Sequence, residues 1–248
     1  MNSPIPKRII QTGTQIELSV LEKACRANVR LMNLGFEYLY FDDNAVNDFV
    51  AREFPQYQDT FQSFRFPIQK YDFFRYLAVY HFGGFYFDLD LLLCEDLSDL
   101  LECSCVFAFE GITFNKYLRR KYGMDWELGN YAFGARPGHP FIRAIVNNCV
   151  RAQMEPEWSN LMVNSVPWLF RRNAYVLCST GPGLVSRTYA ENPDVRSDVK
   201  VLLPGNIYDR KTWHHFGRYG IHLMKSTWRK PRSKLYIYIW NYIMVPKK

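Results

Sequence analysis

Two carboxylates, Asp88 and Asp90, interrupt an apolar run from Phe85 to Leu93. Such a run is typical of a strand that is covered on both faces. Side chains two apart on a strand point to the same face, so we expect Tyr86, Asp88 and Asp90 to share one side. Two like charges in apolar surroundings need a compensating group, and a hard divalent cation such as Mn²⁺ or Mg²⁺ is the simplest one. The pair predicts a metal site, although an isolated Asp-x-Asp is common without one.

A second charged pair precedes this run. Asp72 and Arg75 stand three residues apart in a stretch, residues 71–82, whose length and apolar density predict a mostly buried helix. Residues at i and i+3 are neighbours on a helix, and Gly83 and Gly84 are expected to end it. Taken alone, the pair is a helix ion pair. Next to the acid pair, a functional site is the better interpretation.

The stretch KYDFFRYLAVYHFGGFYFDLD, residues 70–90, resembles the signature of the DXD-containing glycosyltransferases of family 32. This sugar-binding-region group includes mannosyltransferases, α-1,4-glycosyltransferases and capsular polysaccharide enzymes. The resemblance implies an α/β fold, a GT-A-type Rossmann-like domain with a mixed central sheet flanked by helices. It implies a nucleotide sugar as donor and Mn²⁺ or Mg²⁺ as cofactor. Asp88 would hold the ribose and the metal, Asp90 would ligate the metal, and Asp72 and Arg75 would hold the hexose hydroxyls.

Two later segments also resemble this family. The segment from Leu128 to Phe141 matches a family pattern in which Asn130 would contact sugar hydroxyls beside Tyr86. Thr180-Gly181-Pro-Gly matches a glycine-rich loop at the start of a helix, where free N–H groups could bind an oxyanion or a hydroxyl. A simple turn at Gly181 is the alternative.

A last constellation begins at His222. Relatives carry a His followed by a serine and a tryptophan, and His222, Ser226 and Trp228 occupy those places. By this resemblance His222 is a third metal ligand, while Ser226 and Trp228 contact the diphosphate and the leaving group. Lys225 could add positive charge there. A satisfied core histidine is the alternative for His222.

The N-terminal segment departs from the family pattern. Residues 5–12 read as a first strand and resemble the opening that leads into the nucleotide pocket. Ile10 and Gly13 stand where relatives carry His and Trp. If that tryptophan stacks on the base in relatives, this chain must obtain the stack elsewhere.

The remaining elements must position these residues. We expect helices over residues 19–34, with Ser19 and Glu22 as a capping box, over 43–54 and over 140–154. Strands are expected over 36–41, 105–110 and 199–203. Asp42 and Asp43 are interpreted as turn and N-cap residues. The basic, aromatic residues 113–127 are expected to form a loop over the site, and alternating strands and helices indicate an α/β domain.

Composition indicates one globular domain. The chain has 248 residues, 48% of them hydrophobic, and a net charge of +7. Seven basic side chains and no acidic ones lie in residues 225–248, so the rest is neutral, which argues against nucleic-acid binding. We expect a catalytic domain over 1–230 and a basic, aromatic segment over 231–248 that binds an anionic membrane surface or packs on the body. Six cysteines without metal spacing, no signal peptide and no 18-residue apolar run predict a cytoplasmic protein, peripheral to a membrane if that segment binds one.

The function predicted from these residues and the resemblance is a retaining, metal-dependent transfer of a hexose from a nucleotide sugar. UDP-hexose is favoured, GDP-mannose is the other donor considered, and the acceptor is a hydroxyl of a glycan or glycolipid. A haloacid-dehalogenase-type phosphatase is one alternative, because FDLDLL resembles its acid pair, but that pair normally lies near the start of the domain. A non-catalytic carbohydrate- or membrane-binding module is the other.

Overall fold

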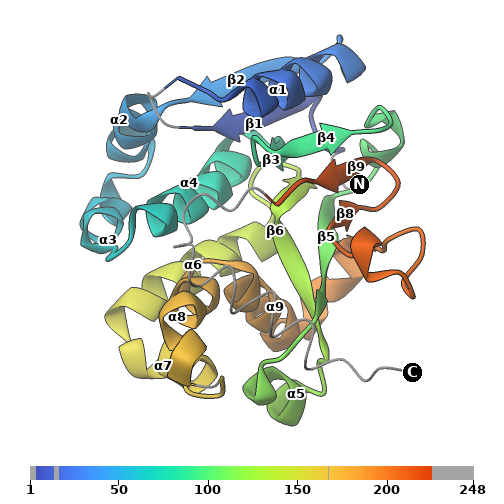
Figure 1. Ribbon diagram of the computed structural model, residues 1–248. Coiled ribbons are helices and arrows are strands. Elements are labelled where there is room, and N and C mark those ends of the chain that lie inside the picture. Colours follow the sequence, from blue (N-terminus) through green and yellow to red (C-terminus); the bar gives the residue numbers. More distant parts are fainter. Residues whose placement is uncertain (1–3, 14–16, 167, 225–248) are drawn as a thin grey trace.

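The computed structural model describes residues 4–13, 17–166 and 168–224 (Figure 1). The strands are β1 Arg8–Thr12, β2 Glu37–Phe41, β3 Gly84–Phe87, β4 Leu91–Leu93, β5 Cys105–Ile112, β6 Trp126–Ala135, β7 Lys200–Leu202, β8 His215–Phe216 and β9 Gly220–His222. The α-helices are α1 Val20–Met32, α2 Asp43–Glu53, α3 Gln58–Ser63, α4 Pro67–Phe82, α5 Lys116–Tyr122, α6 Pro140–Met154, α7 Pro156–Val163, α8 Arg171–Ser179 and α9 Pro182–Glu191.

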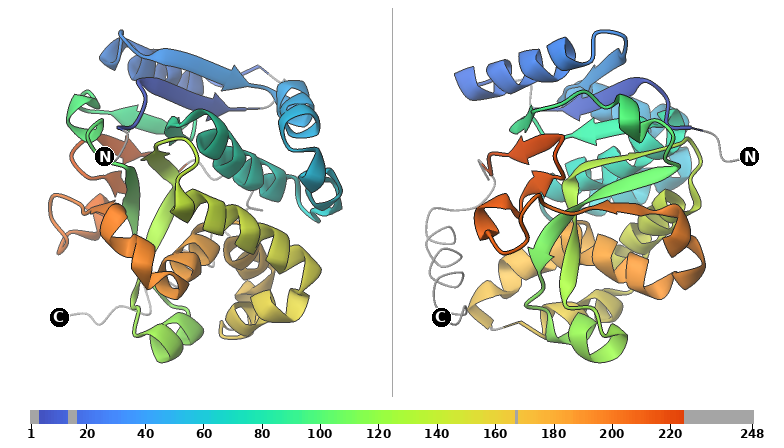
Figure 2. Two further views of the ribbon diagram at one scale, coloured as in Figure 1. Left: turned by 180° about the vertical axis from the view of Figure 1, so that it is seen from behind. Right: turned by 90° about the vertical axis from the view of Figure 1, so that its right-hand side faces the viewer.

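A six-stranded mixed sheet forms the centre, in the order β2-β1-β3-β6-β5-β7. Its first three strands are parallel, β6 is antiparallel to both β3 and β5, and β7 is parallel to β5. A small second sheet, β4-β9-β8, lies beside the first (Figures 1 and 2). The expected α/β fold with a mixed sheet between helices is confirmed.

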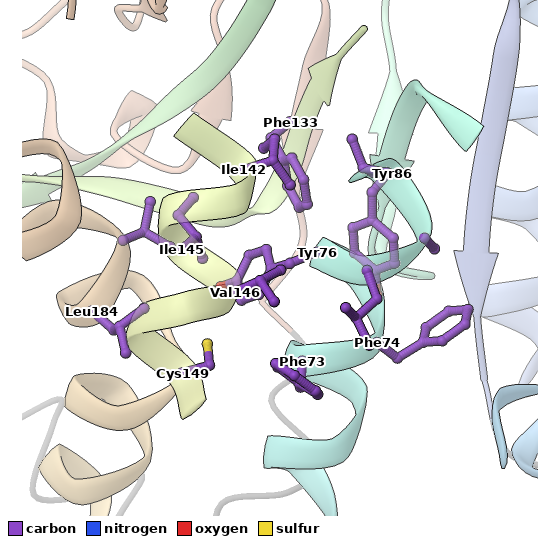
Figure 3. Close-up of a cluster of buried hydrophobic side chains, with 14 of the residues drawn as sticks. Phe73, Phe74, Tyr76, Tyr86, Phe133, Ile142, Ile145, Val146, Cys149 and Leu184 are labelled. Carbon is purple, nitrogen blue, oxygen red and sulfur yellow. The ribbon is translucent and has the colours of Figure 1, made fainter. Parts of the chain in front are cut away.

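One face of the central sheet is covered by α2, α4, α6 and α9. Ring and aliphatic side chains from α4 and α6 meet those of β3 and β6 in a single buried cluster (Figure 3). Phe133 of β6 lies 4.8 Å from Phe107 of β5 and 5.7 Å from Tyr86 of β3, measured between ring centroids. This packing fixes α4, which carries Asp72 and Arg75, against the strand that leads to Asp88.

The opposite face is covered by α1 and the small sheet. Phe85 and Phe87 of β3 point to this side and pack with Val29 of α1 and with Leu91 and Phe216 of the small sheet. Alternation along β3 therefore places Tyr86 in one core and its two phenylalanine neighbours in the other. The strand is buried on both faces, as its apolar sequence predicts.

Several predicted helix ends are confirmed in detail. Ser19 and Glu22 form the capping box of α1, and the Asp42 side chain accepts a hydrogen bond from the Ala45 N–H at the start of α2. Helix α4 ends at Gly83, whose φ of 66° suits glycine. All six cysteines are unpaired.

Two expectations are wrong. Residues 85–93 do not form one strand: β3 ends at Phe87, Asp88–Asp90 form a turn, and β4 joins the other sheet. Residues 113–127 do not form a loop over the site, because 116–122 form α5, capped by Asn115 and ended by Gly123 in the left-handed conformation. Alternation and helix periodicity are weak over stretches this short, and local caps decide the conformation.

Among the described residues, no helix is long and apolar enough to cross a bilayer. The predicted C-terminal segment 231–248 lies outside the described residues.

Candidate active site

The turn after β3 brings two carboxylates and an imidazole together. The N–H of Leu91 donates to the carbonyl of Asp88, which closes the turn, and β4 then pairs with β9 so that Leu91 lies opposite His222. Ligand atoms of Asp88, Asp90 and His222 all lie within 4.8 Å of one another. Carboxylate oxygens suit Mn²⁺ and Mg²⁺, and imidazole is a common ligand of divalent metals, so the residues present fit a divalent cation. The carboxylates converge because the chain turns between them, and not because they alternate along a strand.

His222 is held on two sides. Its Nε2 is 3.2 Å from Oδ1 of Asp90, and its ring stacks on Tyr131, with 4.3 Å between centroids and 14° between planes. The backbone N–H of Leu223 donates to the carbonyl of Asp90, which ties the end of β9 to the turn. The contact with Asp90 and the stacking on Tyr131 together orient the imidazole toward the acid pair.

Asp72 and Arg75 form the expected ion pair, buried below the cluster. Nη2 of Arg75 is 3.1 Å from Oδ1 of Asp72, and Nη1 is 3.1 Å from Oδ1 of Asp88. Arg75 also donates to the carbonyl of Asn130 and lies over the ring of Tyr86. The guanidinium therefore links the two predicted charged pairs.

Asp72 accepts further hydrogen bonds from two neighbouring elements. The amide of Asn130 donates to Oδ1 and the hydroxyl of Thr180 donates to Oδ2, at 3.1 and 2.9 Å. Tyr86 donates to Oδ1 of Asp88 at 2.9 Å. Asn130 and Tyr86 thus lie at the predicted site.

Burial changes the acidity of these groups. It raises the pKa of Asp72 to about 6, although Arg75 and the two hydrogen bonds oppose the shift. Burial also raises the pKa of Asp88, with Arg75 and His222 opposing. Burial lowers the pKa of His222, but the hydrogen bond and negative charge of Asp90 outweigh it and raise that pKa above its ordinary value.

These groups line one cleft of about 650 Å³. All eight predicted site residues within the described residues line it: Asp72, Arg75, Tyr86, Asp88, Asp90, Asn130, Gly181 and His222. Predicted residues Lys225, Ser226 and Trp228 lie outside the described residues. The sequence therefore located one site from segments far apart in the chain.

At Gly181 the structure refines the expectation. Gly181 precedes α9, but its N–H donates to the carbonyl of Val176, and Pro182 has no N–H to offer. The neighbouring Thr180 contacts the site instead, through Asp72. The loop acts here by positioning a hydroxyl.

Gly13 lines the cleft, and neighbouring side chains occupy the space that a side chain at this position would need. A Cβ at this position would lie 2.6 Å from Leu89 Cδ1 and 2.6 Å from the Tyr40 hydroxyl. The tryptophan that relatives carry could not be placed here unless Leu89 and Tyr40 moved. The glycine that departs from the family pattern therefore fits the positions of Leu89 and Tyr40.

Irregular pairing between β5 and β6 positions cleft residues that sequence reasoning missed. Phe107 and Ala108 pair with Phe133 and Gly129, so residues 130–132 of β6 have no partner on β5. Tyr131 lies in this bulge and lines the cleft. No sequence signal distinguished Tyr131 from ordinary core tyrosines, because its role depends on stacking against a distant histidine.

The sequence of residues 15–107 matches a protein family described as the glycosyltransferase sugar-binding region containing a DXD motif. Over these residues the chain is similar to the DXD-containing glycosyltransferases. The matched region ends within β5, and it contains Asp72, Arg75, Asp88 and Asp90.

Curated proteins of two yeasts are also similar to this chain. Inositol phosphoceramide mannosyltransferase 3 of Schizosaccharomyces pombe is 25% identical over 230 residues, which cover 86% of this chain and 57% of that protein. A mannosyl phosphorylinositol ceramide synthase of Saccharomyces cerevisiae is 30% identical over 138 residues, which cover 56% of this chain and 33% of that protein. The chain thus spans little more than half the length of the first relative and a third of the second.

A solved structure shares the fold. The UDP-bound glycosyltransferase domain from the YGT toxin superposes with a TM-score of 0.56 at 10% identity, covering 100% of this chain and 88% of that one. The fold of this chain is of the GT-A type, as expected.

Proposed function

We propose that this chain is a retaining, metal-dependent glycosyltransferase that moves a hexose from a nucleotide sugar to a hydroxyl of a glycan or glycolipid. The observation that carries the proposal is the Asp88–Asp90–His222 cluster, which shares one cleft with the Asp72–Arg75 pair. A metal-ligand set beside a buried polar pocket fits a sugar diphosphate, whose phosphates bind cations and whose hydroxyls need hydrogen-bond partners.

The names of the relatives narrow the choice of donor sugar and of acceptor. Two of them are named as mannosyltransferases or mannosyl synthases of inositol phosphoceramide. We therefore propose mannose as the hexose, with GDP-mannose as its donor, and an inositol-phosphoceramide-type glycolipid as the acceptor. UDP-hexose, favoured from the sequence, is the other donor to be tested.

Asp88, Asp90 and His222 would hold Mn²⁺ or Mg²⁺. When bound, the cation supplies Lewis-acid stabilisation of the leaving diphosphate. Arg75 fixes Asp88 by their 3.1 Å contact and adds positive charge beside it. The contact with Arg75 therefore keeps the carboxylate of Asp88 oriented before the donor binds.

Asp72 and Arg75, with Asn130, would bind the hexose hydroxyls, and Thr180 holds Asp72 in place. Their hydrogen bonds to one another hold each polar atom in place within a buried pocket. Fixed partners of this kind orient the anomeric carbon of the sugar and reduce the entropy lost on reaching the transition state.

The test is a panel of donors in the presence and absence of metal. Thermal shift and donor hydrolysis are measured with GDP-mannose, UDP-glucose and UDP-galactose, each with Mn²⁺, Mg²⁺ or EDTA. We expect one nucleotide sugar to stabilise the protein and to be turned over only with metal. If no nucleotide sugar binds or is turned over, the proposal is wrong; release of phosphate from simple phosphomonoesters would favour the phosphatase.

Transfer itself is measured with inositol phosphoceramide in mixed micelles. The anomeric configuration of the product, read by NMR, tests retention. The control Asp48→Asn changes an exposed carboxylate on α2 that does not line the cleft. It should behave as the wild type.

A further inference from the structure

The second irregularity of the β5–β6 pair lies at Glu110. Phe109 pairs with Leu128 and Gly111 pairs with Glu127, so Glu110 is an extra residue on β5 without a partner on β6. Bulges of this kind re-aim side chains and are frequent next to active sites. Here the bulged residue is an acid whose side chain lines the cleft.

A glycine on the opposite strand leaves room for this carboxylate. A Cβ on Gly129 would lie 2.7 Å from Oε2 of Glu110 and 2.6 Å from Cε1 of Tyr131. Any other residue at 129 would push the carboxylate or the ring away. The bulge on β5 and the glycine on β6 thus together place the carboxylate of Glu110 in the cleft.

The surroundings of Glu110 differ from those of the metal-binding carboxylates. Its side chain is 26% exposed, and Oε1 lies 3.8 Å from Nδ1 of His214. The carbonyl of His214 accepts the N–H of His222, so the β8–β9 segment joins Glu110 to the metal cluster. Glu110 is nevertheless outside that cluster and outside the Asp72–Arg75 network.

We propose that Glu110 is the catalytic residue that binds the acceptor hydroxyl and takes its proton. This inference rests on the proposed function, which assigns Asp88 and Asp90 to the metal and Asp72 to the hexose. The other two acids that line the cleft have structural partners, because Glu22 caps α1 and Glu17 pairs with Lys23. A partly exposed carboxylate on the cleft wall can reach both an incoming acceptor and solvent. Carboxylates are common general bases, and such a base contributes about 10²- to 10⁴-fold to the rate.

The step balances without any further reactant. The bond from the anomeric carbon to the diphosphate oxygen breaks, and the bond from that carbon to the acceptor oxygen forms on the same face of the sugar, so that the configuration is retained. The hydroxyl proton moves to Glu110, which later releases it to water. The products are the glycoside, the nucleoside diphosphate and the regenerated carboxylate.

The experiment compares Glu110→Gln with the wild type and with Glu157→Gln, an exposed control on α7. Binding of GDP-mannose or the UDP-hexose identified by the panel is measured by calorimetry with Mn²⁺, and transfer to inositol phosphoceramide is measured in micelles. We expect Glu110→Gln to bind the donor within about twofold of the wild type and to transfer at least about 100-fold more slowly. Glu157→Gln should match the wild type in both.

A second variant moves the carboxylate without removing it. Gly129→Ala introduces a methyl group that would displace the carboxylate of Glu110, and we expect it to reduce transfer as well. If Glu110→Gln does not fold, Glu110→Asp retracts the carboxylate by one methylene and serves in its place.

Two results overturn the inference alone: transfer by Glu110→Gln within threefold of the wild type, or loss of donor binding together with transfer. Failure of the wild type to bind any nucleotide sugar overturns the proposed function and this inference together. The donor-binding measurement therefore separates the two failures.

Discussion

The Nε2 atom of His222 lies 3.2 Å from Oδ1 of Asp90, although the two residues come from distant parts of the chain. The contact forms across the β4–β9 pair of the small sheet, in which Leu91 lies opposite His222. The small sheet therefore brings His222 to Asp90 in the proposed metal-ligand set, while the large sheet supplies Asp88 at the end of β3.

Removing one ligand should weaken metal binding. We expect Asp90→Asn to reduce Mn²⁺ affinity at least about tenfold, because an amide is a poorer ligand than a carboxylate for a hard cation. Calorimetric titration with Mn²⁺ measures this directly, and Asp48→Asn is the control. Unchanged affinity in Asp90→Asn would exclude the cluster as the metal site.

Arg75 should be important for stability, since it is buried between two carboxylates. Arg75→Met keeps much of the volume but leaves Asp72 and Asp88 without their cation. Removing one partner of a buried ion pair costs about 3 kcal/mol or more in the free energy of unfolding. Urea unfolding measures the loss, and Arg119→Met, exposed on α5, should change stability by less than about 0.5 kcal/mol. A loss below about 1 kcal/mol for Arg75→Met would contradict this account.

Asp72 should make stability depend on pH. Because its pKa is raised to about 6 in the folded chain, the folded state holds a proton that the unfolded state has released. Its contribution is therefore present at low pH and is lost as pH rises through 6. Between pH 5 and pH 8 the wild type should lose about 1.4 kcal/mol relative to Asp72→Asn.

Urea unfolding of both proteins across that range gives the comparison. Parallel pH profiles for the wild type and Asp72→Asn would mean that the carboxylate of Asp72 does not titrate in this range.

Tyr131 should support the metal site through its ring and not through its hydroxyl. The hydroxyl is buried and has no hydrogen-bond partner among the described residues, whereas the ring stacks on His222. We expect Tyr131→Phe to keep wild-type Mn²⁺ affinity and Tyr131→Leu to weaken it about tenfold, since stacked rings contribute about 0.5–1.5 kcal/mol. Equal affinities in the two variants, measured by calorimetry, would rule out a role for stacking.

The sequence by itself indicated the family resemblance, the α/β class and most of the candidate site. Within residues 70–90, Asp72 and Arg75 lie three apart on α4, and Asp88 and Asp90 follow directly after β3, so their nearness in the sequence was enough to predict one site. Helix α6 begins and ends where its sequence predicts, because its proline start and apolar periodicity are local signals.

Tertiary structure decided the rest. The turn at Asp88–Asp90 depends on β4 leaving the central sheet to pair with β9, and such long-range pairing is not encoded in a nine-residue apolar run. Glu110 and Tyr131 enter the cleft through register shifts between β5 and β6, which exist only when the two strands pair. Alternation along one strand can predict a face, but only the partner strand determines where a bulge turns a side chain.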